Sequence, residues 1–194
     1  MTARTDAAQR LLDIAIAQLA EHGASNLSLR QLAARIGTSH RMLIYHFGSK
    51  EGLFTAVVQA MEARQHQLLD QLSLSPDASP DEVARTFWHQ LRDSELRPYI
   101  RLFFEMYGQA VRDQPGTQDM LDGIVEMWTE PLAAFGVRHG LPEATARSYA
   151  RLGLAVTRGL LLDLLATGDE AAVDDAMETF IATYSQALRG AVTP

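Results

Sequence analysis

The residues of this chain with an obvious chemical use lie between Gly37 and Lys50, in the stretch GTSHRMLIYHFGSK. Arg41 carries a planar group that can donate two hydrogen bonds to the O6 and N7 atoms of a guanine. Lys50 precedes a helical pattern, and its ammonium group together with the first amides of that helix can hold a phosphate. The stretch also contains two histidines and a tyrosine, but no arrangement typical of nucleophilic catalysis. It therefore indicates contact with a nucleic acid.

The formal net charge of −7 is unevenly distributed along the 194 residues. Residues 1–50 carry six basic and three acidic side chains, whereas residues 51–194 carry eleven basic and 21 acidic ones. A basic segment joined to an acidic one is typical of a polyanion-binding module attached to a module with another task. We therefore predict a DNA-binding domain over residues 1–50 and a second domain over residues 51–194.

The elements that must position these residues are helices, because apolar residues recur at helical spacing and strand-like alternation is nearly absent. The expected helix caps are serines: Ser28 with Gln31, Ser39, Ser49, and Ser79 with Pro80 and Glu82. A first helix should end at Gly23, and others should span about 28–36, 39–45, 49–72, 80–95, 97–112, 117–139, 143–166 and 170–189. Pro131 predicts a kink or break near Thr129. The predicted fold is all-α, with a three-helix helix-turn-helix domain, a long fourth helix and a C-terminal helical bundle, about nine helices in all.

The run LSLRQLAARIGTSHRMLIYHFGSKEGLF resembles the DNA-binding domain of the TetR family of transcriptional regulators. The resemblance rests on Leu32 and Ala33 before Gly37, on the triplet at 45–47, and on the start of the fourth helix at 49–51. It implies that the third helix enters the major groove of an operator. The residues expected to contact DNA are Arg30, Thr38, Ser39, His40, Arg41, Met42, Ile44, Tyr45, His46 and Lys50.

Two positions depart from the family pattern. Ile44 stands where an aromatic residue is common, so a hydroxyl contact to phosphate is expected to be missing. Arg41 stands where a small residue is common, so it is expected to add a contact to a base. Met42 and Ile44 could pack on the methyl groups of thymines. The resemblance therefore predicts DNA binding without predicting the operator sequence.

The resemblance also implies a homodimer and a small-molecule effector, with two DNA-binding domains on a pseudo-palindromic operator. The dimer interface is expected on the last two helices, which hold more apolar and small residues than one buried face needs: Leu152, Ala155, Gly159, Leu162, Phe180 and Tyr184. An effector pocket is expected in the middle helices, although the same residues could form an ordinary core: Phe87, Trp88, Leu91, Phe103, Phe104, Glu105, Tyr107, Met120, Ile124, Met127, Trp128 and Arg158.

Two other functions stay open from the sequence. An all-helical enzyme would need a titratable pair within the aromatic cluster, and a DNA-binding adaptor without ligand response would have a filled core. Glu62 and His66 are four residues apart, but without a third ligand they are expected to be a solvated pair. We therefore predict no enzyme activity, no cofactor and no metal.

The chain has no cysteine, and no apolar stretch is long enough to span a bilayer. The N-terminal segment is polar and lacks the apolar region of a signal peptide. We therefore expect no membrane partner and a cytoplasmic location. The sequence as a whole predicts a ligand-responsive transcriptional regulator, with repression as the default expected from the resemblance.

Overall fold

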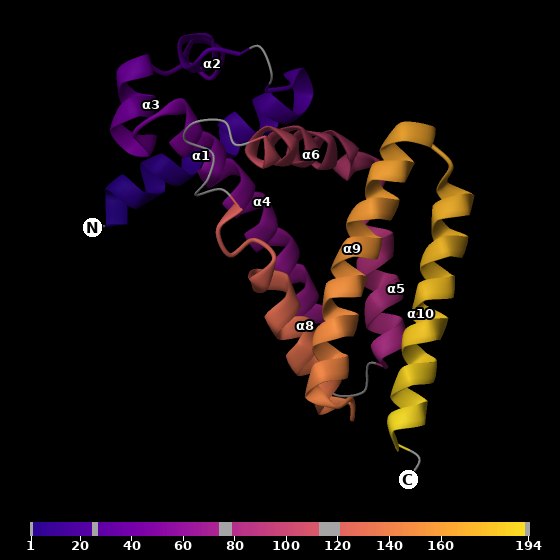
Figure 1. Ribbon diagram of the computed structural model, residues 1–194. Helices are drawn as coiled ribbons and strands as arrows, with labels where there is room; N and C mark the ends of the chain where they lie inside the picture. The colour runs from indigo at the N-terminus through magenta and orange to yellow at the C-terminus, as the bar shows by residue number, and fades with distance from the viewer. Residues whose placement is uncertain (1, 25–26, 74–78, 113–120, 193–194) are drawn as a thin grey trace. The chain divides into compact units, whose positions relative to one another are not determined.

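The computed structural model describes residues 2–24, 27–73, 79–112 and 121–192, and within these ranges all regular secondary structure is helical. The predicted all-α class is therefore confirmed (Figure 1). The helices are α1 Thr2–His22, α2 Leu29–Arg35, α3 His40–Phe47, α4 Lys50–Ser73, α5 Pro80–Leu91, the 3₁₀ turn η1 Ser94–Leu96, α6 Arg97–Val111, α8 Glu126–Arg138, α9 Glu143–Thr167 and α10 Glu170–Val192.

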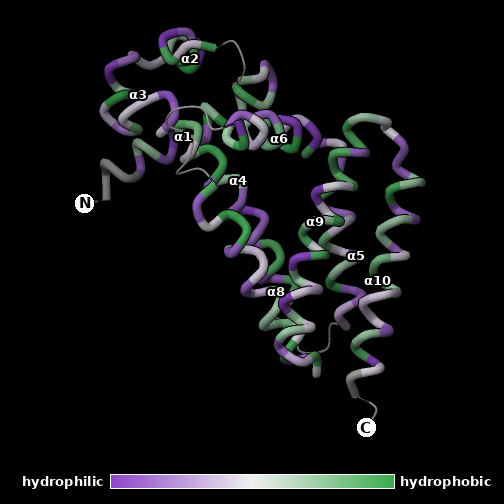
Figure 2. Tube along the Cα trace, in the orientation of Figure 1, coloured by the Kyte–Doolittle hydropathy of each residue, from purple (hydrophilic) through white to green (hydrophobic). Residues whose placement is uncertain are grey.

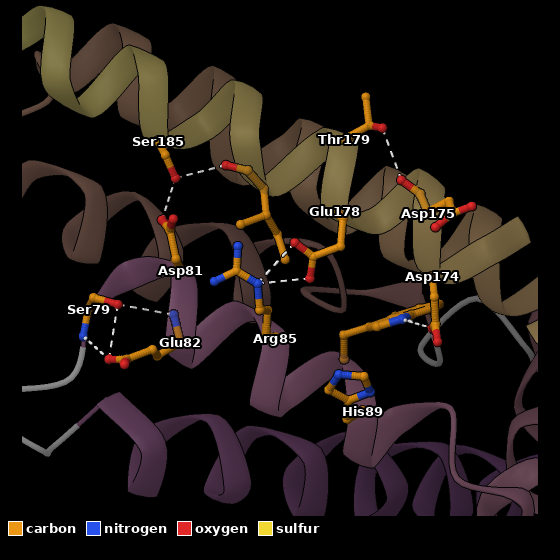
Figure 3. Close-up of polar contacts among 12 residues, drawn as sticks. Ser79, Asp81, Glu82, Arg85, His89, Asp174, Asp175, Glu178, Thr179 and Ser185 are labelled. Carbon is orange, nitrogen blue, oxygen red and sulfur yellow. Dashed lines mark hydrogen bonds and ion pairs between the residues drawn. The ribbon is translucent and has the colours of Figure 1, made fainter. Parts of the chain in front are cut away.

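Helix starts follow the predicted serine caps. Ser28 accepts a hydrogen bond from the amide of Gln31, whose side chain accepts in return from the Ser28 amide. Ser79 and Glu82 form the same reciprocal pair at the start of α5 (Figure 3). Hydrogen bonds from the backbone and the side chain of Ser79 lower the pKa of the Glu82 carboxyl. Each cap satisfies amides that the first turn of a helix leaves without partners.

The described residues of 2–64 and 95–122 form one compact unit, hereafter unit 1. It holds α1, α2, α3, α6 and the first part of α4. Beyond the end of α1, where Gly23 has a φ of +77°, the amide of Ala24 donates to both carboxylate oxygens of Glu105 at 3.1 Å. Because Glu105 lies on α6, this bond ties α6 to the C-terminus of α1. The side chains buried in this unit include Ile16, Leu19, Leu32, Leu43, Leu53, Val57, Leu102 and Met106.

The described residues of 65–94 and 123–192 form a second compact unit, unit 2, in which α8 and α10 pack against α9 and α5 packs against α10. These helices are amphipathic, with hydrophilic and hydrophobic positions alternating along each tube (Figure 2). One buried cluster joins residues from α8, α9, α10 and the α8–α9 connection, and another joins α4, α5, α8 and α9. The first cluster consists of Ala133, Leu141, Ala146, Ala150 and Leu188. The second consists of Leu69, Val83, Trp128 and Leu154.

A row of polar contacts joins α5 to α10 (Figure 3). The Nε atom of Arg85 donates to both carboxylate oxygens of Glu178, at 2.8 and 3.0 Å. This hydrogen bond raises the pKa of Arg85. The indole Nε1 of Trp88 donates to Asp174 at 2.7 Å, so the polar edge of this buried ring points to α10.

The helix expected over 117–139 differs from the structure. α8 begins only at Glu126 and continues through Pro131 to Arg138. Of the kink or break expected near Thr129, the break is therefore wrong. A proline at 131 cannot donate to the carbonyl of Met127, four residues earlier. Instead, the Nε2 atom of His66 donates to that carbonyl at 2.8 Å. An imidazole from α4 thus replaces the missing backbone donor, and the helix tolerates the proline.

The expectation that Glu62 and His66 form a solvated pair is also wrong. Glu62 is 6% exposed, and the His66 side chain is 19% exposed. The His66 ring lies 5.2 Å from the ring of Trp128, and its Nδ1 lies 3.5 Å from a carboxylate oxygen of Asp70. The histidine therefore contacts α8 through its edge and its face, which the four-residue spacing alone did not indicate.

Candidate nucleic-acid interface

The helix-turn-helix is formed by α2, α3 and the turn between them. The two helices pack against each other, and Leu32, Ala33 and Leu43 are buried. Gly37, with a φ of +70°, follows the end of α2, as a left-handed residue commonly does after a helix. The Thr38 amide donates to the carbonyl of Ala33 at 2.9 Å, and α3 then begins. The turn therefore holds α3 at a defined orientation to α2.

Ser39 sets the first residue of α3. Its hydroxyl accepts from the amide of Met42 at 3.1 Å. This hydrogen bond caps α3 and fixes the residue at which the helix begins. The side chains that follow are placed around the helix at about 100° per residue.

The faces of α3 follow from this rotation. Leu43 is fully buried, and Arg41 and Tyr45 project from the opposite side, where Tyr45 is 55% exposed. Met42 and Ile44 lie on the two flanks and are 40% and 38% exposed. The outward surface of α3 therefore has a basic and phenolic ridge with an apolar side chain on each flank.

The residues expected to contact DNA fall into two groups by exposure. Arg30 and Ser39 are exposed, together with the four outward residues of α3. Thr38, His40, His46 and Lys50 are half-buried. The Nε2 atom of His46 is buried and finds no hydrogen-bond partner in the described part of the chain. His46 instead packs edge-on against Tyr45, with ring centroids 5.0 Å apart, so it presents less surface than its neighbour.

Two glycines determine how α3 meets α4. Gly48 has φ and ψ of +79° and −54°, and the Ser49 amide donates to the carbonyl of Phe47 at 2.9 Å. This is a γ-turn with positive φ, which a residue other than glycine adopts only under strain. A Cβ atom built on Gly52 would overlap the backbone oxygen of Phe47. The two helices therefore approach too closely at this joint for a side chain.

Lys50 is the first residue of α4 and is placed by the same joint. The Ser49 hydroxyl accepts from the amide of Gly52 at 2.9 Å, which caps the helix. The Nζ atom of Lys50 lies 5.1 Å from the centroid of the Phe54 ring. The ammonium group thus stands near the N-terminus of α4, where an anion is favoured. Gly52 was missed by the sequence reasoning, although a glycine inside a helical pattern is a signal of close packing.

A comparison with protein families matches residues 11–57 to the model of the bacterial regulatory proteins of the tetR family. The match runs from the middle of α1 to the first turns of α4 and includes the helices that form the surface just described. Residues 11–57 belong to the TetR family. The chain is a transcriptional regulator of that family, and the resemblance seen in the sequence is confirmed.

Several known proteins are similar to this chain over most of its length. The HTH-type transcriptional repressor Rv3405c of Mycobacterium tuberculosis is 28% identical over 143 residues, which are 72% of this chain and 71% of that protein. A transcriptional regulator from Rhodococcus sp. Rha1 has a structure with a TM-score of 0.77 and 22% identity, covering 96% and 99% of the two chains. The multidrug binding protein EbrR, solved in complex with imidazole, gives a TM-score of 0.68 with 24% identity over 93% and 92%. These structures share the fold of this chain.

The residues expected to line an effector pocket are divided between the two units. Four of them lie on α6 in unit 1, where the ring of Phe103 is 5.3 Å from that of Phe104 and 5.6 Å from that of Tyr107. The fourth, Glu105, accepts from Ala24. Unit 2 holds Phe87, Trp88, Leu91, Ile124, Met127, Trp128 and Arg158. Met120 lies outside the described residues. The pocket stays a prediction.

Within unit 2 the aromatic residues point in two directions. The rings of Phe87 and Trp128 lie 5.8 Å apart, next to the ring of His66. Trp88, one position along α5, donates to Asp174 on α10. Trp88 therefore lies about 100° around α5 from Phe87 and contacts α10, whereas Phe87 contacts α8.

The residues expected at the dimer interface also differ in exposure. Leu152 and Leu162 are 46% and 52% exposed on α9, and Ala155 and Gly159 between them are exposed. Phe180 packs against Gly153, and a Cβ on that glycine would be 3.4 Å from the ring. Tyr184 packs beside the cluster around Ala146, where burial raises the pKa of its phenol, with a smaller contribution from Tyr149. These two rings belong largely to the packing of unit 2 itself.

Among the described residues, no three His, Cys, Asp or Glu side chains come together in a way that could hold a metal ion. No helix in the same ranges is long and apolar enough to cross a membrane.

Proposed function

We propose that this chain is a homodimeric repressor that binds a pseudo-palindromic operator through α3 and is released by a small-molecule effector. The observation that carries the proposal is the surface of α3, where Arg41 and Tyr45 project opposite the buried Leu43. An α-helix with such a surface fits the major groove of B-DNA. In this proposal residues 1–50 bind DNA, and residues 51–194 carry the dimer interface and the effector site.

Dimerisation is supported by the exposed face of α9. Leu152, Ala155, Gly159 and Leu162 are spaced three or four residues apart and so lie on one face of the helix. Small residues between two leucines allow a second helix to approach closely, as in a four-helix interface about a two-fold axis. A single helix-turn-helix contacts few bases, and two of them one helical turn apart would recognise a palindrome.

Repression and release are supported by the relatives. The similar protein Rv3405c is named a transcriptional repressor, and the similar EbrR is named a multidrug binding protein. In this chain the half-buried Phe87 and the buried Trp128 offer the kind of aromatic wall that a small apolar ligand uses. Release requires that the effector prefer the form of the protein that does not fit the operator, by a few kcal/mol. We propose a cytoplasmic location, where the operator would be, and no catalytic role, cofactor or metal.

The experiment that tests the proposal is selection of duplex DNA from a random pool by the purified protein at about 0.15 M salt. Enrichment of a pseudo-palindromic site would support a dimeric, sequence-specific regulator. That site would then be used to screen small molecules for release. If no site is enriched, even after the protein has been unfolded and refolded to remove any bound effector, the proposed function is wrong.

A further inference from the structure

Met42 and Ile44 are large apolar side chains exposed on the helix proposed to enter DNA. They are 40% and 38% exposed. Two residues along an α-helix correspond to about 200° of rotation, so the two side chains lie on nearly opposite flanks of α3. Arg41 and Tyr45, four residues apart, share the ridge between these flanks. The inward position between Met42 and Ile44 is Leu43, which is fully buried.

The two apolar flanks can recognise one kind of group among the base edges of the major groove. Neither side chain can exchange a strong hydrogen bond with a base edge or a phosphate. The C5-methyl group of thymine is the apolar group that the major groove exposes. Across an A·T pair the groove presents the adenine N7 and N6, then the thymine O4 and its methyl, so the methyl lies on the side of the thymine strand. A flank of the helix that faces one strand would therefore meet the thymine methyls of that strand.

We propose that Met42 and Ile44 are specificity-determining residues that pack on thymine methyl groups of opposite strands within one half-site. Arg41, on the ridge between them, faces the bases that separate these thymines. The inference rests on the proposed function, because it assumes that α3 lies in the major groove. It goes further by stating which chemical group of the operator each flank recognises and on which strand.

The first test uses the unaltered protein and the operator obtained by selection. Each thymine of a half-site is replaced in turn by uracil, which keeps the base pair and lacks only the methyl group. Affinity is measured by fluorescence anisotropy at about 0.15 M salt. We expect at least one thymine on each strand at which the change weakens binding by about fourfold, and by about 15-fold when both half-sites are changed.

The second test assigns each methyl group to a side chain. Met42→Ala should abolish the effect of uracil on one strand and keep it on the other, and Ile44→Ala should do the reverse. Val137→Ala is the matched control, because it truncates a side chain that is 45% exposed on α8 in unit 2. This variant should keep both uracil effects. Circular dichroism of the variants should match that of the unaltered protein, since both flank residues are exposed.

Three outcomes would overturn the inference while leaving the proposed function intact. In the first, the selected operator tolerates uracil at every thymine. In the second, both variants lose the same uracil effect, which places the two side chains on one strand. In the third, both variants keep both uracil effects, which assigns the methyl contacts to other residues. Failure to select any operator would instead contradict the proposed function, so the two failures are distinguishable.

Discussion

Arg41 and Lys50 carry positive charges that should act on DNA in different ways. Arg41 is exposed on the outward face of α3, so Arg41→Ala should remove a base contact and relax specificity at one position of the operator by about 1–3 kcal/mol. Lys50 stands at the start of α4, so Lys50→Ala should weaken all duplexes about equally and reduce the salt slope by roughly one unit. Binding titrations at several salt concentrations, on operator and unrelated DNA, check both.

Arg138→Ala is the control for these charge removals, because this arginine is exposed at the end of α8 in unit 2. It should change neither the specificity nor the salt slope. If Lys50→Ala lowers affinity for the operator alone, the residue contacts a base and the proposed phosphate contact is incorrect.

Tyr184 should titrate later than an ordinary tyrosine. Burial raises the pKa of its phenol in the folded state, whereas in the unfolded chain it stays near 10. The stabilising contribution of the neutral phenol is therefore fully present below about pH 10 and is lost as the pH rises through the folded-state pKa. Denaturant unfolding between pH 9 and 11 should show a loss of stability that is smaller in Tyr184→Phe. An equal alkaline loss in both proteins would refute this assignment.

A contact between His66 and α8 should compensate for Pro131. The Nε2 atom donates to the Met127 carbonyl that the proline leaves without its backbone donor. His66→Leu should therefore cost about 0.5–1.5 kcal/mol in the free energy of unfolding, because the Met127 carbonyl loses its hydrogen-bond partner. In a Pro131→Ala background, residue 131 regains its N–H, and the same change should cost less.

The measurement is a double-mutant cycle by chemical denaturation. His22→Leu is the control, because this histidine is exposed on α1 and should be additive with Pro131→Ala. Additive costs for His66 and Pro131 would show that the imidazole does not replace the missing donor.

The joint between α3 and α4 should not tolerate a side chain at Gly52. A Cβ at this position would overlap the carbonyl oxygen of Phe47, which is backbone and cannot rotate away. Gly52→Ala should therefore destabilise the protein by about 1–3 kcal/mol and weaken operator binding, because α3 and Lys50 shift. Gly108→Ala is the matched control: it lies in α6 with nothing within 4 Å, so it should stabilise by roughly 0.5–1 kcal/mol. Equal stability of the two variants would contradict the close approach.

The helices could be predicted well where a local signal marks them. Ser28, Ser39 and Ser79 each cap the helix that the sequence assigns to them, because a cap depends on residues two or three positions away. The helix around Pro131 could not be predicted, because its compensating donor comes from His66, 65 residues earlier. Contacts between distant segments leave no periodic pattern in the sequence.

The arrangement of the chain into units was less predictable than its elements. The boundary expected at residue 50 follows the change in charge, whereas the compact unit around α1 also includes α6. The hydrogen bond from the Ala24 amide to Glu105 is one reason that α6 belongs to this unit, because it joins α6 to the residues after α1. The sequence indicated only that Glu105 could line a pocket. For the nucleic-acid interface, the residue types were predictable from the motif. Their relative exposure, such as the half-buried His46, depends on how α3 packs.

At the scale of the whole molecule, the exposed face of α9 should hold the proposed dimer together. Leu152 and Leu162 are exposed on one face of α9, with Ala155 and Gly159 between them. Leu152→Glu combined with Leu162→Glu should place charges in the interface and convert the dimer to a monomer of 21.4 kDa. Operator affinity should then fall by about 100-fold or more, because the second half-site no longer binds through a linked partner.

Sedimentation equilibrium and operator titration would measure the two effects together. Val137→Glu is the control, since it adds a charge at a similarly exposed apolar position on α8 and should leave both the mass and the affinity unchanged. A variant that becomes monomeric but keeps full operator affinity would show that each DNA-binding domain acts alone. A variant that stays dimeric would place the interface on another surface. The expected result, loss of both, would tie operator recognition to the exposed face of α9.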